Sequence, residues 1–417
     1  MRKSVHPSRI EGVLDAPPSK SVMLRLTAAA LLAEGGMTRI RNPSRCEDAR
    51  AGLRVAAALG ASVSDSPLEI AISGGLRPRR RVLDCGESGL SLRMFAAVAA
   101  LSAEEVELTG GPALLRRPAG PVETTLRDLG AEGRTRDGYP PVVVRGPLRG
   151  GEAAVDGSGS SQFLTGLLLA LPLAERDSIL NVRGLVSRPY VDLTLQILEL
   201  CGLRIGREGY GRFSIPAGQR FAAGNFRVEG DWSAAAFLFV LGAAGGKIRV
   251  KGLDMSSLQP DRVVLDVLEE AGARIVRGAD GAEVERGPLR AFRFDASDAP
   301  DLVPPLAALA CHCEGTSVLK GAGRLKFKES DRAAALAEEL GALGARVALA
   351  GGVLEITGGP LRGGIGRTRG DHRVAMALAA AAVAARAPVT IEGAEHAAKS
   401  YPRFFEDLAS AGGKIDE

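Results

Sequence analysis

The sequence consists of six copies of one unit of about 70 residues. In each copy a helix-like stretch ends in a glycine and is followed by a strand-like run. The glycines are Gly60, Gly130, Gly202, Gly272, Gly344 and Gly412, at intervals of 70, 72, 70, 72 and 68 residues. Glycine adopts without strain the left-handed conformation that commonly ends a helix. The period is too long for a typical solenoid repeat and predicts six supersecondary units.

A second helix-like stretch, rich in Ala and Leu, occupies the other half of each unit. Strand-like runs such as MTRIRN (37–42) and KIRVKG (247–252) follow these stretches. Two helices interleaved with strands give a βαβαββ-like repeat and an α/β fold. Because 417 residues are enough for two or three domains, we expect two lobes of three repeats each.

Composition and charge exclude several classes of protein. With 46% hydrophobic and 24% charged residues the chain is of the globular type, and a net charge of +4 argues against a general nucleic-acid-binding surface. The longest apolar run, 374–385, is too short to span a bilayer, and the N-terminus does not resemble a signal peptide. Five cysteines without a paired framework indicate a reducing compartment. We therefore expect a cytoplasmic protein with no nucleic-acid or membrane partner.

Polar residues recur where each helix is expected to begin. In the Ala-rich helices these are Ser19, Ser88, Ser160, Asp231, Asp301 and Asp371, and in the other helices they lie near Asp48, Arg117, Ser187, Gln259, Lys328 and Lys399. A single Ser or Asp at such a position is most simply an N-cap. A cation there is different, because the helix dipole makes it unfavourable by about 0.3 to 1 kcal/mol.

Six cations are expected at or beside these helix starts: Lys20, Arg117, Lys328, Arg332, Arg373 and Lys399. Free backbone N–H groups, the dipole and an added cation together form a strong anion site. Any one long side chain could instead bend into solvent, but this alternative weakens when it must explain all six. The pattern predicts anionic ligands.

Two carboxylates stand among these cations. Asp301 is expected to open a helix and Glu329 follows Lys328 directly, so a base and an acid could act on a bound anion. Each could also be only a helix-stabilising residue. The run Cys311-His312-Cys313 lies in a helical stretch without a second ligand pair, which favours burial in the core over a zinc site.

Six segments, in order along the chain, resemble the 5-enolpyruvylshikimate-3-phosphate synthase family: PSKSVMLR (18–25), DGSGSSQF (156–163), SRPYVD (187–192), KFKESDR (326–332), GDHRVAM (370–376) and AKSYPRFF (398–405). The resemblance implies a two-lobed inverse α/β barrel fold of the enolpyruvyl transferase type, with the active site in the cleft between the lobes. One lobe would be residues 18–226, and the other residues 1–17 with 227–417.

The resemblance also implies an activity. Family members transfer the enolpyruvyl group of phosphoenolpyruvate to the 5-hydroxyl of shikimate 3-phosphate and release phosphate, in the shikimate pathway of aromatic amino-acid (chorismate) biosynthesis. We therefore expect a transferase that needs no metal or organic cofactor, takes small anionic substrates and is a monomer.

The resemblance assigns residues by motif. The catalytic residues would be Asp301 as base, Glu329 as acid and Lys20 as an assisting cation. Shikimate 3-phosphate would be bound by Lys20, Ser21, Arg25, Ser160, Ser161, Gln162, Ser187, Tyr190, Asp301 and Lys328. Phosphoenolpyruvate would be bound by Lys20, Gly89, Arg117, Gln162, Arg332, Arg373 and Lys399.

The chain departs from the family pattern at Glu87, where Asn is usual, and at Leu90, Met94, Ala113 and Arg324. A glutamate beside an anionic ligand should weaken binding unless it is protonated or paired. Affinity and sensitivity to glyphosate are therefore not carried over to this chain.

Other functions remain open at this point. The related UDP-N-acetylglucosamine enolpyruvyl transferase shares the fold, but it usually has a reactive Cys in a loop equivalent to 111–120, which contains none here. An RNA-end-binding protein would need an asymmetric basic surface, which a net charge of +4 does not indicate. A non-catalytic protein that binds anionic metabolites would share the cations but has no reason to keep both Asp301 and Glu329.

Overall fold

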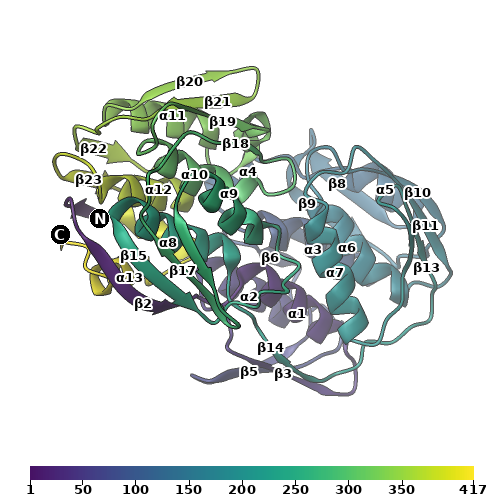
Figure 1. Ribbon diagram of the computed structural model, residues 1–417. Coiled ribbons are helices and arrows are strands. Elements are labelled where there is room, and N and C mark those ends of the chain that lie inside the picture. The colour runs from purple at the N-terminus through teal and green to yellow at the C-terminus, as the bar shows by residue number, and fades with distance from the viewer. The chain divides into compact units, whose positions relative to one another are not determined.

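The computed structural model describes residues 1–417, which divide into two compact units. Unit 1 comprises Met1–Pro17 and Glu229–Glu417, and unit 2 comprises Pro18–Val228 (Figure 1). The boundary lies two residues later than the expected 226/227 division. The reason is that strand β14 (Asn225–Arg227) pairs in parallel with β3 (Met37–Arg41), and the Val228 N–H donates to the carbonyl of Arg41.

Each repeat forms a four-stranded sheet of the same topology. In the sheet β6-β7-β9-β8, strands β6 (Val82–Asp84) and β7 (Val106–Thr109) are parallel and are linked through a helix. Strands β8 (Glu132–Arg136) and β9 (Tyr139–Arg145) form an antiparallel hairpin, and β9 pairs with β7. Six such sheets, three in each unit, confirm the α/β class and the six βαβαββ-like repeats.

Unit 2 contains the sheets β14-β3-β5-β4, β6-β7-β9-β8 and β10-β11-β13-β12. Its other strands are β4 (Ser62–Asp65), β5 (Glu69–Ser73), β10 (Glu152–Asp156), β11 (Ser178–Arg183), β12 (Gly206–Glu208) and β13 (Arg212–Ile215). Its helices are α1 (Lys20–Leu32), α2 (Glu47–Ala58), α3 (Gly89–Ala99), α4 (Pro112–Leu115), α5 (Val122–Asp128), α6 (Gln162–Ala170), the 3₁₀ turn η1 (Leu171–Leu173) and α7 (Pro189–Leu200).

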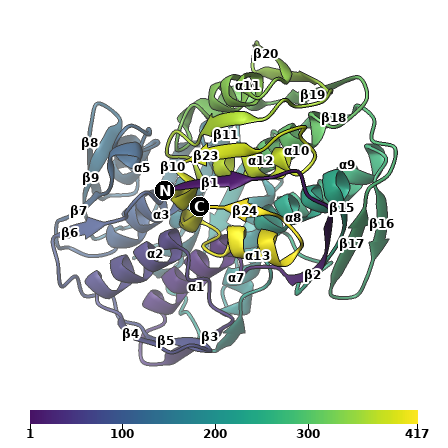
Figure 2. The same cartoon turned by 90° about the vertical axis from the view of Figure 1, so that its left-hand side faces the viewer.

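Unit 1 takes its first two strands from the N-terminus of the chain. Strand β2 (Ile10–Asp15) pairs in parallel with β15 (Gly246–Lys251), and β1 (Arg2–Val5) lies between β23 (Val389–Glu392) and β24 (Ile415–Asp416), as Figure 2 shows. The remaining strands are β16 (Arg274–Arg277), β17 (Gly281–Glu285), β18 (Arg293–Asp295), β19 (Thr316–Lys320), β20 (Arg346–Ala350), β21 (Val353–Thr357) and β22 (Gly364–Arg367).

The helices of unit 1 alternate with 3₁₀ turns. They are α8 (Trp232–Gly245), η2 (Pro260–Val263), α9 (Val264–Glu270), η3 (Pro300–Leu302), α10 (Val303–Ala310), η4 (Ala322–Phe327), α11 (Arg332–Ala342), α12 (His372–Ala382), η5 (Ala394–Lys399) and α13 (Phe404–Ser410). None of the helices of the chain is long and apolar enough to cross a membrane.

The helix-ending role predicted for the six repeated glycines is confirmed. Each lies two residues after the last residue of α2, α5, α7, α9, α11 or α13, and each has a φ between 79° and 127°. A side chain is strained in that backbone region, so glycine is favoured there.

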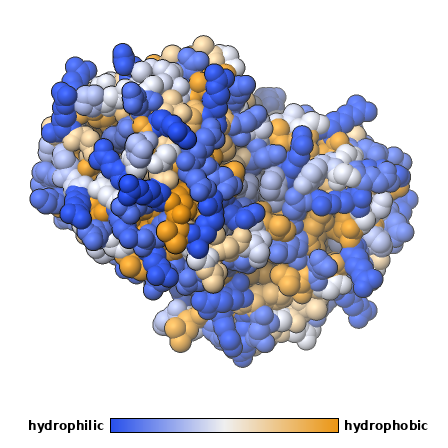
Figure 3. Space-filling model, in the orientation of Figure 1, coloured by the Kyte–Doolittle hydropathy of each residue, from blue (hydrophilic) through white to orange (hydrophobic).

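The Ala-rich helices form the core of each unit, and polar side chains cover most of the surface seen in Figure 3. Cys311 and Cys313 are also core residues, as expected. Their thiols donate to carbonyl oxygens of α10, at 3.3 Å from Ala307 and 3.4 Å from Leu309. Burial raises the pKa of both thiols to about 12, so both stay protonated in the core.

Small residues let the buried helices approach closely. A Cβ on Gly166 of α6 would lie 2.5 Å from the carbonyl oxygen of Met94 in α3, whereas a Cβ on Gly341 of α11 would meet no atom within 4 Å. We predict that Gly166→Ala destabilises the protein by about 1–3 kcal/mol, because the rigid backbone of α3 must move. The control Gly341→Ala should stabilise by about 0.5 kcal/mol through helix propensity. Urea unfolding of both variants tests this, and equal midpoints would contradict the close packing of α3 and α6.

Candidate functional site

A cluster of charged residues in unit 1 surrounds the side chain of Arg332, the first residue of α11. We call it the Arg332 cluster; it consists of Asp301, Lys328, Glu329, Arg332, Asp371, Arg373 and Lys399. The guanidinium of Arg332 is 1% exposed. It donates to the carboxylates of Asp371 (2.8 and 3.2 Å), Asp301 (3.1 Å) and Glu329 (2.5 Å). Burial alone would lower the pKa of Arg332, but the three carboxylates outweigh it and raise that pKa.

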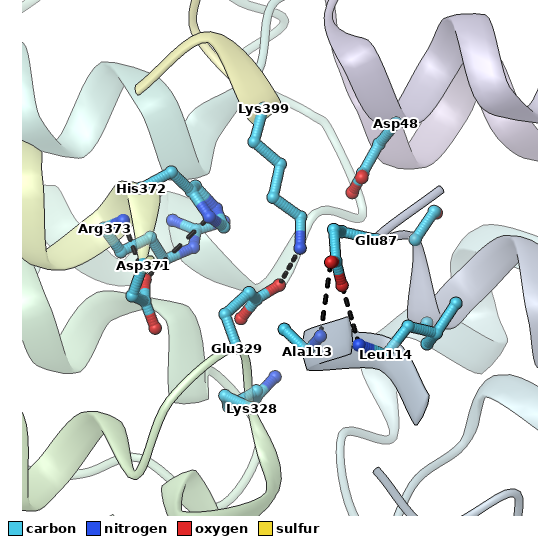
Figure 4. Close-up of polar contacts among 12 residues, drawn as sticks. Asp48, Glu87, Ala113, Leu114, Lys328, Glu329, Asp371, His372, Arg373 and Lys399 are labelled. Atoms are coloured by element: carbon cyan, nitrogen blue, oxygen red, sulfur yellow. Dashed lines mark hydrogen bonds and ion pairs between the residues drawn. The ribbon is translucent and has the colours of Figure 1, made fainter. Parts of the chain in front are cut away.

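Asp301 and Glu329 are each shared among several cations. Asp301 lies in η3 and accepts from Arg332, from Arg373 at 3.1 Å and from Lys328 at 3.5 Å. Glu329 accepts from Arg332 and, at 2.8 Å, from Lys399, a contact drawn in Figure 4. The Arg332 cluster therefore contains four cations and three carboxylates joined by ion pairs.

Asp371 anchors the cluster to α12. Its carboxylate accepts the backbone N–H of Arg373 at 2.9 Å as the N-cap of the helix, and it also accepts from Ser330 at 3.2 Å. Glu329, Asp371 and His372 bring possible ligand atoms within 4.8 Å of one another. However, Arg332 already donates to both carboxylates and Lys399 to one of them. This arrangement is an ion-pair network, and its charges leave little reason for a metal.

Several of the predicted residues of unit 2 lie at or just before the first residue of α1, α6 or α7. Lys20 is the first residue of α1 and forms an ion pair of 3.0 Å with Asp48 of α2. Ser161 occupies the N-cap position of α6 without a side-chain capping hydrogen bond, and the hydroxyl of Ser160 accepts the N–H of Gln162 at 3.2 Å. Ser187 has a φ of 55° two residues before α7.

Arg25 is a buried cation held by neutral groups. It donates to the hydroxyl of Thr194 at 2.9 Å and to the carbonyl oxygens of Ser21 at 2.9 Å and Tyr190 at 3.1 Å, with a longer contact of 3.5 Å to Thr165. Its guanidinium carbon lies 5.9 Å from the ring centroid of Tyr190. Burial lowers the pKa of Arg25 to about 10, and the tyrosine opposes this shift. Ser21, Arg25 and Tyr190 are thus brought together, as expected.

A second group in unit 2 forms around Gly89, the first residue of α3. A Cβ at Gly89 would lie 2.7 Å from guanidinium nitrogens of both Arg93 and Arg117. Arg93 donates to the side chain of Gln162 at 2.8 Å and to the carbonyl oxygen of Pro118 at 3.1 Å. Gly89, Arg117 and Gln162 therefore lie close together. Arg93 is not among the residues predicted from the sequence, although an arginine in an otherwise apolar helix was a signal for it.

Several expected helix starts are wrong. Arg117 lies between α4 and α5, Lys328 follows the last residue of η4, and Lys399 is the last residue of η5. Asp301 does lie where a helical segment opens, because it is the second residue of η3, which runs directly into α10. Prolines and 3₁₀ turns delay these helices. Lys20, Arg332 and Arg373 do lie in a first helical turn.

Glu87, one of the unusual positions, lies in the turn between β6 and α3. Its carboxylate accepts the backbone N–H groups of Ala113 at 3.2 Å and of Leu114 at 2.6 Å (Figure 4). Two backbone N–H groups thus stabilise the charge of Glu87. Arg324 donates to the carbonyl oxygen of Ser297 at 2.5 Å, and Leu90 and Met94 are buried.

Comparisons with known proteins agree on one family. The model of the family described as EPSP synthase (3-phosphoshikimate 1-carboxyvinyltransferase) matches residues 5–408. The chain is 42% identical to the 3-phosphoshikimate 1-carboxyvinyltransferase of Aeropyrum pernix, over 100% of this chain and 96% of the relative. It is 43% identical to the enzyme of that name from Methanopyrus kandleri, over 97% and 96%.

Comparison with solved structures points to the same family. The EPSP synthase of Acinetobacter baumannii superposes with a TM-score of 0.83 and 28% sequence identity, covering 100% of both chains. Since the family match spans nearly the whole chain and includes the segments that build the sites of both units, the chain belongs to the EPSP synthase (3-phosphoshikimate 1-carboxyvinyltransferase) family and is a transferase.

Proposed function

We propose that this chain transfers the enolpyruvyl group of phosphoenolpyruvate to the 5-hydroxyl of shikimate 3-phosphate, with Asp301 and Glu329 as its proton-transfer residues. Asp301 accepts the hydroxyl proton as the oxygen attacks C2 of phosphoenolpyruvate, and Glu329 protonates the methylene carbon, assisted by Lys20. Loss of phosphate and of a methyl proton from the tetrahedral intermediate then regenerates the C=C double bond and gives the enol ether product. General acid–base catalysis of this kind needs groups within hydrogen-bond reach of the reacting atoms.

The contacts of Glu329 and Asp301 support a role for both at the binding site. Glu329 accepts from Arg332 and Lys399, and Asp301 accepts from Arg373 and Lys328. These four cations belong to the set proposed here to bind the two substrates. The two carboxylates would therefore lie beside the bound anions, within reach of the reacting atoms.

The main support for the proposed binding site is the burial of the Arg25 side chain without a carboxylate partner. Arg25 is 1% exposed and hydrogen-bonds only to hydroxyl and carbonyl oxygens. A buried cation without a carboxylate is costly, and an anionic ligand would offset that cost. We propose that shikimate 3-phosphate is bound by Arg25 with Lys20, Ser21, Ser160, Ser161, Gln162, Ser187, Tyr190, Asp301 and Lys328.

We propose that phosphoenolpyruvate is bound by Lys20, Gly89, Arg117, Gln162, Arg332, Arg373 and Lys399. The two substrates together carry about five or six negative charges, with roughly 1.5 to 2 on each phosphate. Seven cations are available: Lys20, Arg25, Arg117, Lys328, Arg332, Arg373 and Lys399. These cations come from both units, so we propose that the active site needs both.

We further propose that the enzyme acts as a cytoplasmic monomer. All of the proposed residues come from one chain, and each unit has its own core. The five cysteines are buried free thiols, which suits a reducing compartment.

The activity is tested by measuring phosphate release from phosphoenolpyruvate with shikimate 3-phosphate, beside the same assay with UDP-N-acetylglucosamine as acceptor. We expect release only with the first acceptor. Release only with the second, or none from folded protein, would contradict the proposal.

We predict that Asp301→Ala and Glu329→Gln each lower kcat at least about a hundredfold, because each removes a proton-transfer group. Asp331→Asn is the matched control: Asp331 lies two residues from Glu329 and caps α11 through the N–H of Ala334, and asparagine caps equally well. Steady-state kinetics at fixed pH measures all three. A near-normal rate for Asp301→Ala or Glu329→Gln would show that the substituted residue has only a structural role.

A further inference from the structure

Glu87 accepts two backbone N–H groups of α4 that have no acceptor within the helix. That helix has only four residues, begins with Pro112, and has Gly111 as an N-cap without a side chain. Proline has no N–H group, so the first unsatisfied donors are those of Ala113 and Leu114. The two carboxylate oxygens of Glu87 accept one each, at 3.2 and 2.6 Å. A carboxylate from another segment thus caps this helix, where its charge also suits the helix dipole.

The fit around Glu87 is tight. The N–H of Gly111 donates to the carbonyl oxygen of Gly86 at 2.8 Å. A Cβ on Gly111 would lie 2.2 Å from Oε1 of Glu87, and a Cβ on Gly110 would lie 2.2 Å from the carbonyl oxygen of Gly86. Glycine at 110 and 111 therefore lets the turn before α3 seat directly on the segment 110–118.

The other end of segment 110–118 is held by helix α3, which follows Glu87 in the chain. Arg93 of α3 donates to the carbonyl oxygen of Pro118. Between the two attachment points lies Arg117, 6% exposed, with its guanidinium against the Cα of Gly89. The segment that carries Arg117 is thus fixed at one end by Glu87 and at the other by Arg93.

We infer that Glu87 is a positioning residue that holds Arg117 in place for phosphoenolpyruvate. The inference rests on the proposed role of Arg117. It also explains how a glutamate is tolerated beside an anion site: both of its oxygens accept backbone N–H groups, which stabilise its charge. Asparagine, the usual residue at this position in the family, has one acceptor oxygen and could satisfy only one of the two donors.

The test combines kinetics with hydrogen exchange on Glu87→Ala and Glu87→Gln, with Glu105→Ala as a control. Glu105 is half exposed in the same unit and pairs with Arg134 on the surface, so its variant removes the same charge. We expect Glu87→Ala to raise KM for phosphoenolpyruvate at least about tenfold, with KM for shikimate 3-phosphate within about twofold of wild type. Glu87→Gln should be intermediate, and Glu105→Ala unchanged.

A double mutant distinguishes positioning from a general effect. In an Arg117→Ala background, Glu87→Ala should change KM for phosphoenolpyruvate by less than about twofold, because the two residues act as one unit. Additive effects, an equal rise in both KM values, or an unchanged KM for phosphoenolpyruvate in Glu87→Ala would overturn the inference.

Hydrogen exchange followed by mass spectrometry gives a readout that needs no catalysis. Peptides covering 110–118 should exchange faster in Glu87→Ala than in wild type, and peptides covering α7 should not. Unchanged exchange in 110–118 would overturn the inference. If wild-type protein released no phosphate, the proposed function would fail, while the exchange result would still decide whether Glu87 holds this segment.

Discussion

The arrangement of unit 1 depends on one buried guanidinium. Arg332 is inaccessible to water, so its charge and its N–H groups must be satisfied by the protein. The three carboxylates that do this come from different segments: Asp301 precedes α10, Glu329 precedes α11 and Asp371 caps α12. Removing one partner of such a buried pair typically costs about 3–5 kcal/mol. Arg332 thus fixes the proposed base and the proposed acid relative to each other.

Two buried arginines are stabilised in different ways. In unit 1 Arg332 is paired with three carboxylates. In unit 2 Arg25 is held by hydroxyl and carbonyl oxygens, and burial lowers its pKa to about 10. A bound anion would offset the cost of burying Arg25, in line with the role proposed for it in binding shikimate 3-phosphate.

Much of the fold and part of the site could be predicted from the sequence. The spacing of the glycines gave the repeats, because a helix end needs a particular backbone conformation that glycine favours. Lys20, Arg332 and Arg373 lie in first helical turns as expected, whereas Arg117, Lys328 and Lys399 lie in turns that sequence periodicity does not distinguish from helix starts. The roles of Arg93, Asp48 and Glu87 depend on partners 25 to 69 residues away. Such contacts are set by tertiary packing, so the local sequence does not identify the partners.

The proposed roles of Asp301 and Glu329 depend on the buried guanidinium of Arg332, which donates to both carboxylates. Asp371→Asn tests this most directly, because asparagine still caps α12 but no longer forms an ion pair with Arg332. The guanidinium then loses its charged partner on α12 and no longer holds the two proposed proton-transfer groups in place, so kcat should fall at least about tenfold. A kcat within about twofold of wild type, from a folded variant, would contradict the account.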